Sequence, residues 1–156
     1  MLSTVIVVLD QVTKHAVRYS FRPGESTVVV PSFFDLTYVR NTGAVWGSFQ
    51  HQNEWLAVVS VAVLALIALF YHHLVGGRKL FALAFAFIMG GIIGNLIDRV
   101  KLGWVTDFLD FYLNTSHWPA FNIADSGICI GVGLYLLASL WPVITGKYSA
   151  KPASHK

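Results

Sequence analysis

The chain has 156 residues, and its 11 Lys and Arg with 8 Asp and Glu make up only 12%, where an ordinary soluble domain carries roughly 25% charged residues. Hydrophobic residues make up 55%, and the mean hydropathy is +0.61. A soluble domain could not cover its surface with so few polar groups, so the composition predicts a polytopic membrane protein. The length excludes a second globular domain, which leaves one membrane domain, residues 1–156. The scattered cations, net charge +3, fit the flanks of membrane segments better than a nucleic-acid surface.

The N-terminal segment 1–17 is predicted to be a short first helix. Met1 to Leu9 is apolar, but Asp10 and Lys14 follow at once and leave too few residues for an uninterrupted span. These two residues are four apart, so they share one helix face and can pair.

The segment 18–54 is predicted to lie outside the membrane. Pro23-Gly24 marks a turn, and the β-branched and aromatic residues in 27–30 and 33–39 favour strands. A small sheet on the membrane surface fits this pattern.

Three later segments, 55–75, 80–97 and 121–144, are apolar and long enough to cross a bilayer. Between the last two, residues 100–120 form a second interfacial segment, whose tryptophans suit the edge of the membrane. The predicted fold class is therefore an all-α polytopic membrane protein of four transmembrane helices, with a small β-cradle and this second segment on one side.

Polar and ionisable residues gather on that same side of the four-span map. Such groups are costly within or at the ends of spans and by default mark a function. They are Asp10, Lys14, Asn41, Asn95, Asp98, Arg99, Asp107, Asp110, Asn122 and Asp125.

Two carboxylates brought together at a partly dry site cannot both ionise easily, so they share a proton. An aspartic hydrolase uses such a pair, with one carboxylate taking a proton from water while the other polarises the carbonyl. Spacing alone leaves open which carboxylates pair, because Asp98 is as good a candidate as Asp107 or Asp125. It also leaves open the reading of an intramembrane Asp as a proton-relay residue.

Other catalytic classes find no support in the motifs. The sequence lacks a Gly-x-Ser-x-Gly elbow, a His-Glu-x-x-His pair and a Walker loop. Its one cysteine, Cys129, sits in an apolar run and is expected to be a buried packing residue. No metal and no cofactor are expected.

Five blocks occur in order along nearly the whole chain, and together they are highly specific. They are Asp10-Gln-Val-Thr-Lys14, Arg40-Asn41-Thr-Gly43-Ala44-Val-Trp-Gly47, Gly90-Gly-Ile-Ile-Gly94-Asn95-Leu-Ile-Asp98-Arg99, Val105-Thr-Asp107-Phe108 and Phe121-Asn122-Ile-Ala124-Asp125. The chain resembles the bacterial lipoprotein signal peptidases, or signal peptidase II, a family of intramembrane aspartic proteases.

The resemblance implies that Asp107 and Asp125 are the catalytic dyad. It implies that further residues orient the substrate and hold the dyad, namely Asp10, Lys14, Asn41, Gly43, Asn95, Asp98, Arg99, Asn122 and Ala124. Small residues at Gly43, Ala44 and Gly47 are expected in a cradle that closes over the substrate.

The family removes the signal peptide from diacylglyceryl-modified prolipoproteins, cleaving just before the lipidated cysteine. The resemblance therefore implies a multi-pass protein of the bacterial cytoplasmic (inner) membrane with its active site at the periplasmic face. A prolipoprotein substrate and membrane lipids are the expected partners, with no nucleic acid, and a monomer is expected.

Two departures from the family pattern stand out, a first helix that starts short and Val45 where a smaller residue is expected. The rival interpretation is a small proton-coupled transporter or channel subunit, which predicts polar residues along a path through the bilayer. A third, a non-catalytic lipid-binding scaffold, predicts that Asp125→Asn is tolerated.

Overall fold

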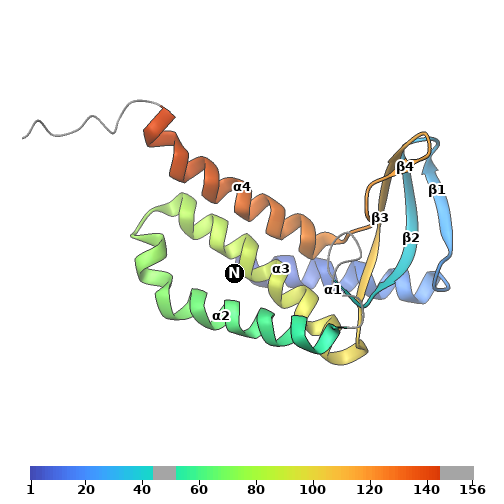
Figure 1. The fold of residues 1–156 in the computed structure, drawn as a ribbon, viewed down its shortest axis with the longest axis horizontal. Coiled ribbons are helices and arrows are strands. Elements are labelled where there is room, and N and C mark those ends of the chain that lie inside the picture. The colour runs from blue at the N-terminus through green and yellow to red at the C-terminus, as the bar shows by residue number, and fades with distance from the viewer. Residues whose placement is uncertain (44–51, 145–156) are drawn as a thin grey trace, which may run out of the picture.

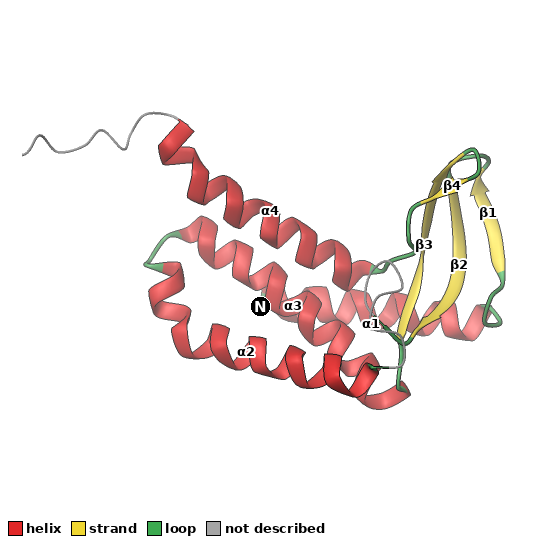
Figure 2. Cartoon of the chain, viewed as in Figure 1, coloured by secondary structure: helices red, strands yellow, loops and turns green. Residues whose placement is uncertain are grey.

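A computed structural model describes residues 1–43 and 52–144 of the chain. Ala44, Val45 and Gly47, for which a cradle role is predicted, lie outside the described residues. The helices and a small sheet form two layers, with the sheet standing across one end of the helices (Figure 2). In chain order the elements are α1 Leu2–Ser20, β1 Ser26–Val30, β2 Phe34–Asn41, α2 Asn53–Val75, α3 Lys79–Leu102, β3 Val105–Leu113, β4 Ser116–His117 and α4 Ile123–Ile144.

Helices α2, α3 and α4 are long and apolar enough to cross a membrane, which confirms the three clearest predicted spans. Helix α3 continues to Leu102, five residues past the end of the predicted span, because its last turn is charged and lies beyond the apolar run. Gly76 and Gly103 end α2 and α3 in the left-handed conformation, with φ of 53° and 84°, which glycine adopts without steric cost.

Helix α1 runs along only part of the bundle formed by α2, α3 and α4. Its first residues lie beside the middle of α3, since Ser3 and Ile6 approach Gly90, and it then runs past the C-terminal half of α3 toward the sheet (Figure 1). Its 19 residues are about 28 Å long at 1.5 Å per residue. The described α1 therefore lines one half of the bundle's length rather than all of it. This agrees with the predicted short first helix, while the prediction of four transmembrane helices is not confirmed.

The sheet is antiparallel, in the order β1-β2-β3-β4. The two predicted strands in 18–54 are confirmed as β1 and β2. The second interfacial segment is not separate from this sheet, because its central part is strand β3, which pairs along β2. In β2, one extra residue between Leu36 and Val39 faces the step from Leu109 to Asp107, and such bulges re-aim side chains near active sites.

Glycines let the helices approach closely. A Cβ on Gly91 would meet the backbone carbonyl of Ala124, and one on Gly131 would lie 2.6 Å from the carbonyl oxygen of Ala84. Small residues commonly allow such close packing between membrane helices. Helix α4 is held tightly against α3, and its N-terminal residues are placed by that contact.

Candidate active site

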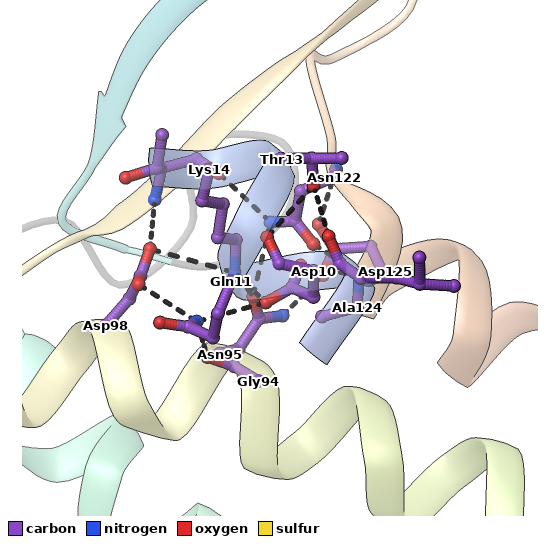
Figure 3. Close-up of polar contacts among 12 residues, drawn as sticks. Asp10, Gln11, Thr13, Lys14, Gly94, Asn95, Asp98, Asn122, Ala124 and Asp125 are labelled. Atoms are coloured by element: carbon purple, nitrogen blue, oxygen red, sulfur yellow. Dashed lines mark hydrogen bonds and ion pairs between the residues drawn. The ribbon is translucent and has the colours of Figure 1, made fainter. Parts of the chain in front are cut away.

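The first turn of α4 carries Asp125 within a reciprocal cap. The Asn122 side-chain oxygen accepts the Asp125 backbone N–H at 3.0 Å, and Asp125 Oδ2 accepts the Asn122 backbone N–H at 3.2 Å. This capping box is favoured by the spacing Asn-x-x-Asp. It leaves Asp125 Oδ1 to accept Asn95 Nδ2 at 2.7 Å (Figure 3).

Asp107 stands on β3, 2% exposed, directly after the bulge. Its Oδ1 accepts Asn122 Nδ2 at 2.7 Å and its Oδ2 accepts Asn41 Nδ2 at 2.9 Å. Asn122 therefore touches both carboxylates, one through its side-chain amide and the other through its backbone. Burial, reinforced by the neighbouring Asp125 carboxylate, raises the pKa of Asp107 to about 7.

Helix α1 contributes a buried ion pair behind the carboxylates. Lys14 Nζ lies 2.9 Å from Asp10 Oδ2, and both side chains are fully buried. Asp10 Oδ1 accepts the backbone N–H of Ala124 at 2.9 Å. A carboxylate from α1 therefore caps the start of α4, where the negative charge of Asp10 is favourable beside the partial positive charge of the helix N-terminus. The predicted pairing of Asp10 with Lys14 is confirmed.

Asp98 belongs to this supporting network and does not line the cavity. It lies 3.7 Å from Lys14 Nζ and 3.5 Å from Arg18 Nη1, and its Oδ2 accepts the Thr106 backbone N–H at 3.0 Å. Its position ties α3 to α1 and to the start of β3. Asp98 is therefore engaged in ion pairs with Lys14 and Arg18 and is not paired with Asp107 or Asp125.

Arg99 reaches toward the described end of β2. Its Nη2 donates to the Gly43 carbonyl at 3.3 Å, and the Gly43 N–H donates to Asn41 Oδ1 at 2.9 Å. The Arg99 Nε atom is buried with no hydrogen-bond partner in the described part of the chain, which leaves a donor for a bound molecule.

A cavity of about 670 Å³ joins these groups and reaches down among the helices. Its polar lining includes Arg40, Asn41, Asn95, Arg99, Asp107 and Asp125, and its apolar lining includes Val39, Ile92, Trp118, Phe121 and Ile128. Cys129 also lines it and is exposed. The expectation of a buried Cys129 is wrong, because one turn after Asp125 the helix presents position 129 to the cavity.

The structure thus brings all the predicted site residues into one region. Two of these residues lie at the edge of the region: Gly43 follows β2, and Ala124 packs against α3.

The sequence analysis did not identify Gln11, whose Nε2 donates to the Gly94 carbonyl at 3.0 Å and to Asp98 Oδ1 at 3.2 Å. It also missed Arg18 and fully buried Thr106, joined at 3.0 Å. The i, i+4 series from Asp10 through Lys14 to position 18 signals Arg18, whereas nothing in the sequence singles out Thr106.

Known proteins match this fold closely. The chain superposes on a solved bacterial membrane enzyme with a TM-score of 0.87 at 31% identity, covering 96% of this chain and 92% of that one. A second bacterial membrane enzyme gives 0.79 at 32% identity, covering 89% and 90%. With three apolar helices long enough to span a membrane, the chain is a multi-pass membrane protein with the fold of a membrane enzyme.

Residues 2–141 match the family described as Signal peptidase (SPase) II. A lipoprotein signal peptidase of Syntrophotalea carbinolica is 42% identical over 141 residues, 88% of either chain, and one of Geobacter sulfurreducens is 45% identical over 131 residues, 82% of either. The chain belongs to the signal peptidase II family, and it is a peptidase by that membership.

Proposed function

We propose that the chain is an intramembrane aspartic endopeptidase that removes the signal peptide from diacylglyceryl-modified prolipoproteins, just before the lipidated cysteine. The observation that carries this proposal is the pair Asp107 and Asp125, which line one cavity and are joined through Asn122. The relatives named lipoprotein signal peptidase support the substrate class.

In the proposed reaction the two carboxylates share one proton at rest. Its place is Asp107, whose pKa is raised to about 7, because the helix N-terminus favours the ionised form of Asp125. Asp125 takes a proton from water as its oxygen attacks the scissile carbonyl carbon, while Asp107 gives its proton to the carbonyl oxygen. The resulting diol returns one hydroxyl proton to Asp107 as the C–N bond breaks, and the amine leaves with the proton that Asp125 took from water.

The proposed setting is the bacterial cytoplasmic membrane, with the sheet and dyad at the periplasmic face. There water reaches the scissile bond while the signal helix and the acyl chains arrive from the bilayer. The apolar lining by Ile92 and Ile128 suits that approach. We propose a single membrane domain that acts as a monomer on prolipoprotein among membrane lipids, with no nucleic acid.

The distribution of polar groups favours this reading over a proton-coupled transporter or channel subunit. A transporter needs polar groups along a path through the bilayer. Within the described chain the network reaches Gly94 and Asn95 on α3, and the preceding half of that helix, residues 80–89, is apolar.

The test is cleavage of a diacylglyceryl-modified prolipoprotein by the purified chain in detergent, with a metal chelator present throughout. The expected result is cleavage by the parent, with kcat lowered at least about 10²-fold in Asp107→Asn and in Asp125→Asn. Asp110→Asn is the matched control, because it removes a carboxylate from the same strand that pairs with His117 outside the cavity. Parental rates in either dyad variant would show that the dyad is wrong.

A further inference from the structure

A side-chain amide has a donor end and an acceptor end, so its orientation decides what a neighbouring carboxylate meets. Asn95 bridges the supporting network and the dyad: its Nδ2 lies 2.7 Å from Asp125 Oδ1 and its Oδ1 lies 2.8 Å from Lys14 Nζ. With this orientation Asp125 receives an N–H. With the amide reversed it would face a carbonyl oxygen.

The orientation of Asn95 is set by what lies on its other side. The Lys14 ammonium has three donors and no acceptor, so only an oxygen can face it. A second donor, Asn122 Nδ2, lies 3.2 Å from the same Asn95 oxygen. Lys14 makes the shorter contact and carries the charge.

Lys14 is itself held rigidly. Its side chain is fully buried, its Nζ lies 2.9 Å from Asp10 and 3.7 Å from Asp98, and no solvent competes for it. The charged groups that face the network are Asp10, Lys14 and Arg18 from α1, Asp98 and Arg99 from α3, Asp107 from β3 and Asp125 from α4. Among these cations, Lys14 is the one hydrogen-bonded to Asn95 in the described chain.

We infer that Lys14 is a positioning residue for hydrolysis, which turns the Asn95 amide so that its N–H holds Asp125 as the ionised base (Figure 3). This inference rests on the proposed function, because it assigns the base role to Asp125. It predicts an effect on the protonation of Asp125, which the Lys14 ammonium does not contact directly.

Without the ammonium, the Asn95 oxygen keeps only the longer contact from Asn122 Nδ2, so the amide is held less firmly and its reversed form becomes populated. Its oxygen then accepts from a protonated Asp125, and the ionised form loses both an N–H and a nearby positive charge. The base is then protonated at a higher pH, so the acidic limb of the rate profile moves upward. Substrate contacts are unchanged, so kcat is affected and KM is not.

The experiment compares Lys14→Met with Arg18→Met in a pH profile of kcat and KM on diacylglyceryl-modified prolipoprotein. Loss of a charge-assisted hydrogen bond predicts a kcat about tenfold lower at neutral pH in Lys14→Met, with the acidic limb about one pH unit higher. KM is expected to stay within about twofold. Arg18→Met removes a cation from the same Asp98 without contacting Asn95, so its limb is expected to stay where the parent has it.

An unmoved limb in Lys14→Met would overturn the inference, as would an equal displacement in Arg18→Met. Should Lys14→Met fail to fold, Asp10→Asn/Lys14→Met replaces it, because that pair is charge-balanced and keeps an oxygen for the Ala124 N–H.

A second readout is independent of turnover and so separates failure of this inference from failure of the proposed function. The infrared C=O stretch of protonated carboxyl groups is titrated in the purified chain, and the Asp125 part is assigned by its loss in Asp125→Asn. The band is expected to persist to higher pH in Lys14→Met than in the parent. Unchanged titration overturns the inference even if the chain proves to cleave nothing.

Discussion

Asp107 combines burial with three close electrostatic partners. Two amide N–H groups favour its charge, while burial and Asp125 oppose it more strongly, so its pKa rises from 3.8 to about 7. Between these values the folded chain holds a proton that the unfolded chain has released. The contribution of Asp107 to the free energy of unfolding is therefore fully present below pH about 4, and it is lost as the pH rises through about 7.

The first prediction concerns this loss. Asp107→Asn removes the titration, so the fall in Tm between pH 5 and pH 8 is expected to be about 5 °C smaller in this variant than in the parent. Thermal unfolding in detergent measures it. Asp35→Asn, which changes a carboxylate on the neighbouring strand that accepts the Tyr112 hydroxyl, is expected to keep the parental slope. Identical slopes in parent and Asp107→Asn would mean that Asp107 is ionised throughout this range.

At this scale the sequence predicts residue types better than partners. Asp10 and Lys14 were predictable as a pair, because helical spacing fixes which side chains share a face. The choice among Asp98, Asp107 and Asp125 was not, because it depends on which carboxylates reach the cavity. Cys129 was misjudged for the same reason: a run of apolar neighbours indicates a helix but does not say which face meets a cavity.

At the scale of elements, the site depends on three helices meeting without a gap. Gly94 stands where α1, α3 and α4 converge, and a Cβ there would lie 2.6 Å from Asp10 Oδ2 and 3.1 Å from the Ala124 Cβ. Both neighbours are buried and engaged with each other through the Ala124 N–H, so neither can move without disturbing the start of α4.

The second prediction is that Gly94→Ala lowers the free energy of unfolding by about 1–3 kcal/mol and lowers activity further, by displacing Asp125. Gly133→Ala is the matched control, because a Cβ there meets nothing within 4 Å. It is expected to be neutral or to stabilise α4 by about 0.5–1 kcal/mol. Denaturant unfolding of both variants measures this, and equal stabilities would contradict the tight contact.

Strand β3 shows what element-level prediction misses. Its residues Val105 to Leu113 include aromatic and β-branched types, yet the two Asp residues break the apolar pattern, and the segment was predicted only as interfacial. The pairing with β2 supplies the missing information. Since strand propensity depends on neighbouring strands, the sequence alone indicates β2 more clearly than the partner that completes it.

At the scale of the whole molecule, the charged and amide side chains that line the cavity belong to β2, β3, the C-terminal part of α3 and the start of α4. These segments meet at the end of the bundle that carries the sheet (Figure 1). This convergence was predictable, because consecutive spans alternate in direction and the polar residues fall at alternate span ends. The depth of α1 was not. The apolar run predicts that a helix forms, but the position of α1 along α3 is set by the packing of Ser3 and Ile6 against Gly90. No periodicity in the sequence indicates that contact.

The third prediction concerns the orientation of the chain in the membrane. The turn between α2 and α3 lies at the end of the bundle away from the sheet (Figure 1), so single cysteines at exposed Thr115 and exposed His73 report opposite sides. In a Cys129→Ser background, a membrane-impermeant maleimide is expected to label Thr115→Cys on intact cells. It is expected to label His73→Cys only after permeabilisation. Because the proposed dyad shares the sheet's end of the bundle, the reverse pattern would place it on the cytoplasmic side, where a peptidase could not meet a prolipoprotein's scissile bond at the periplasmic face.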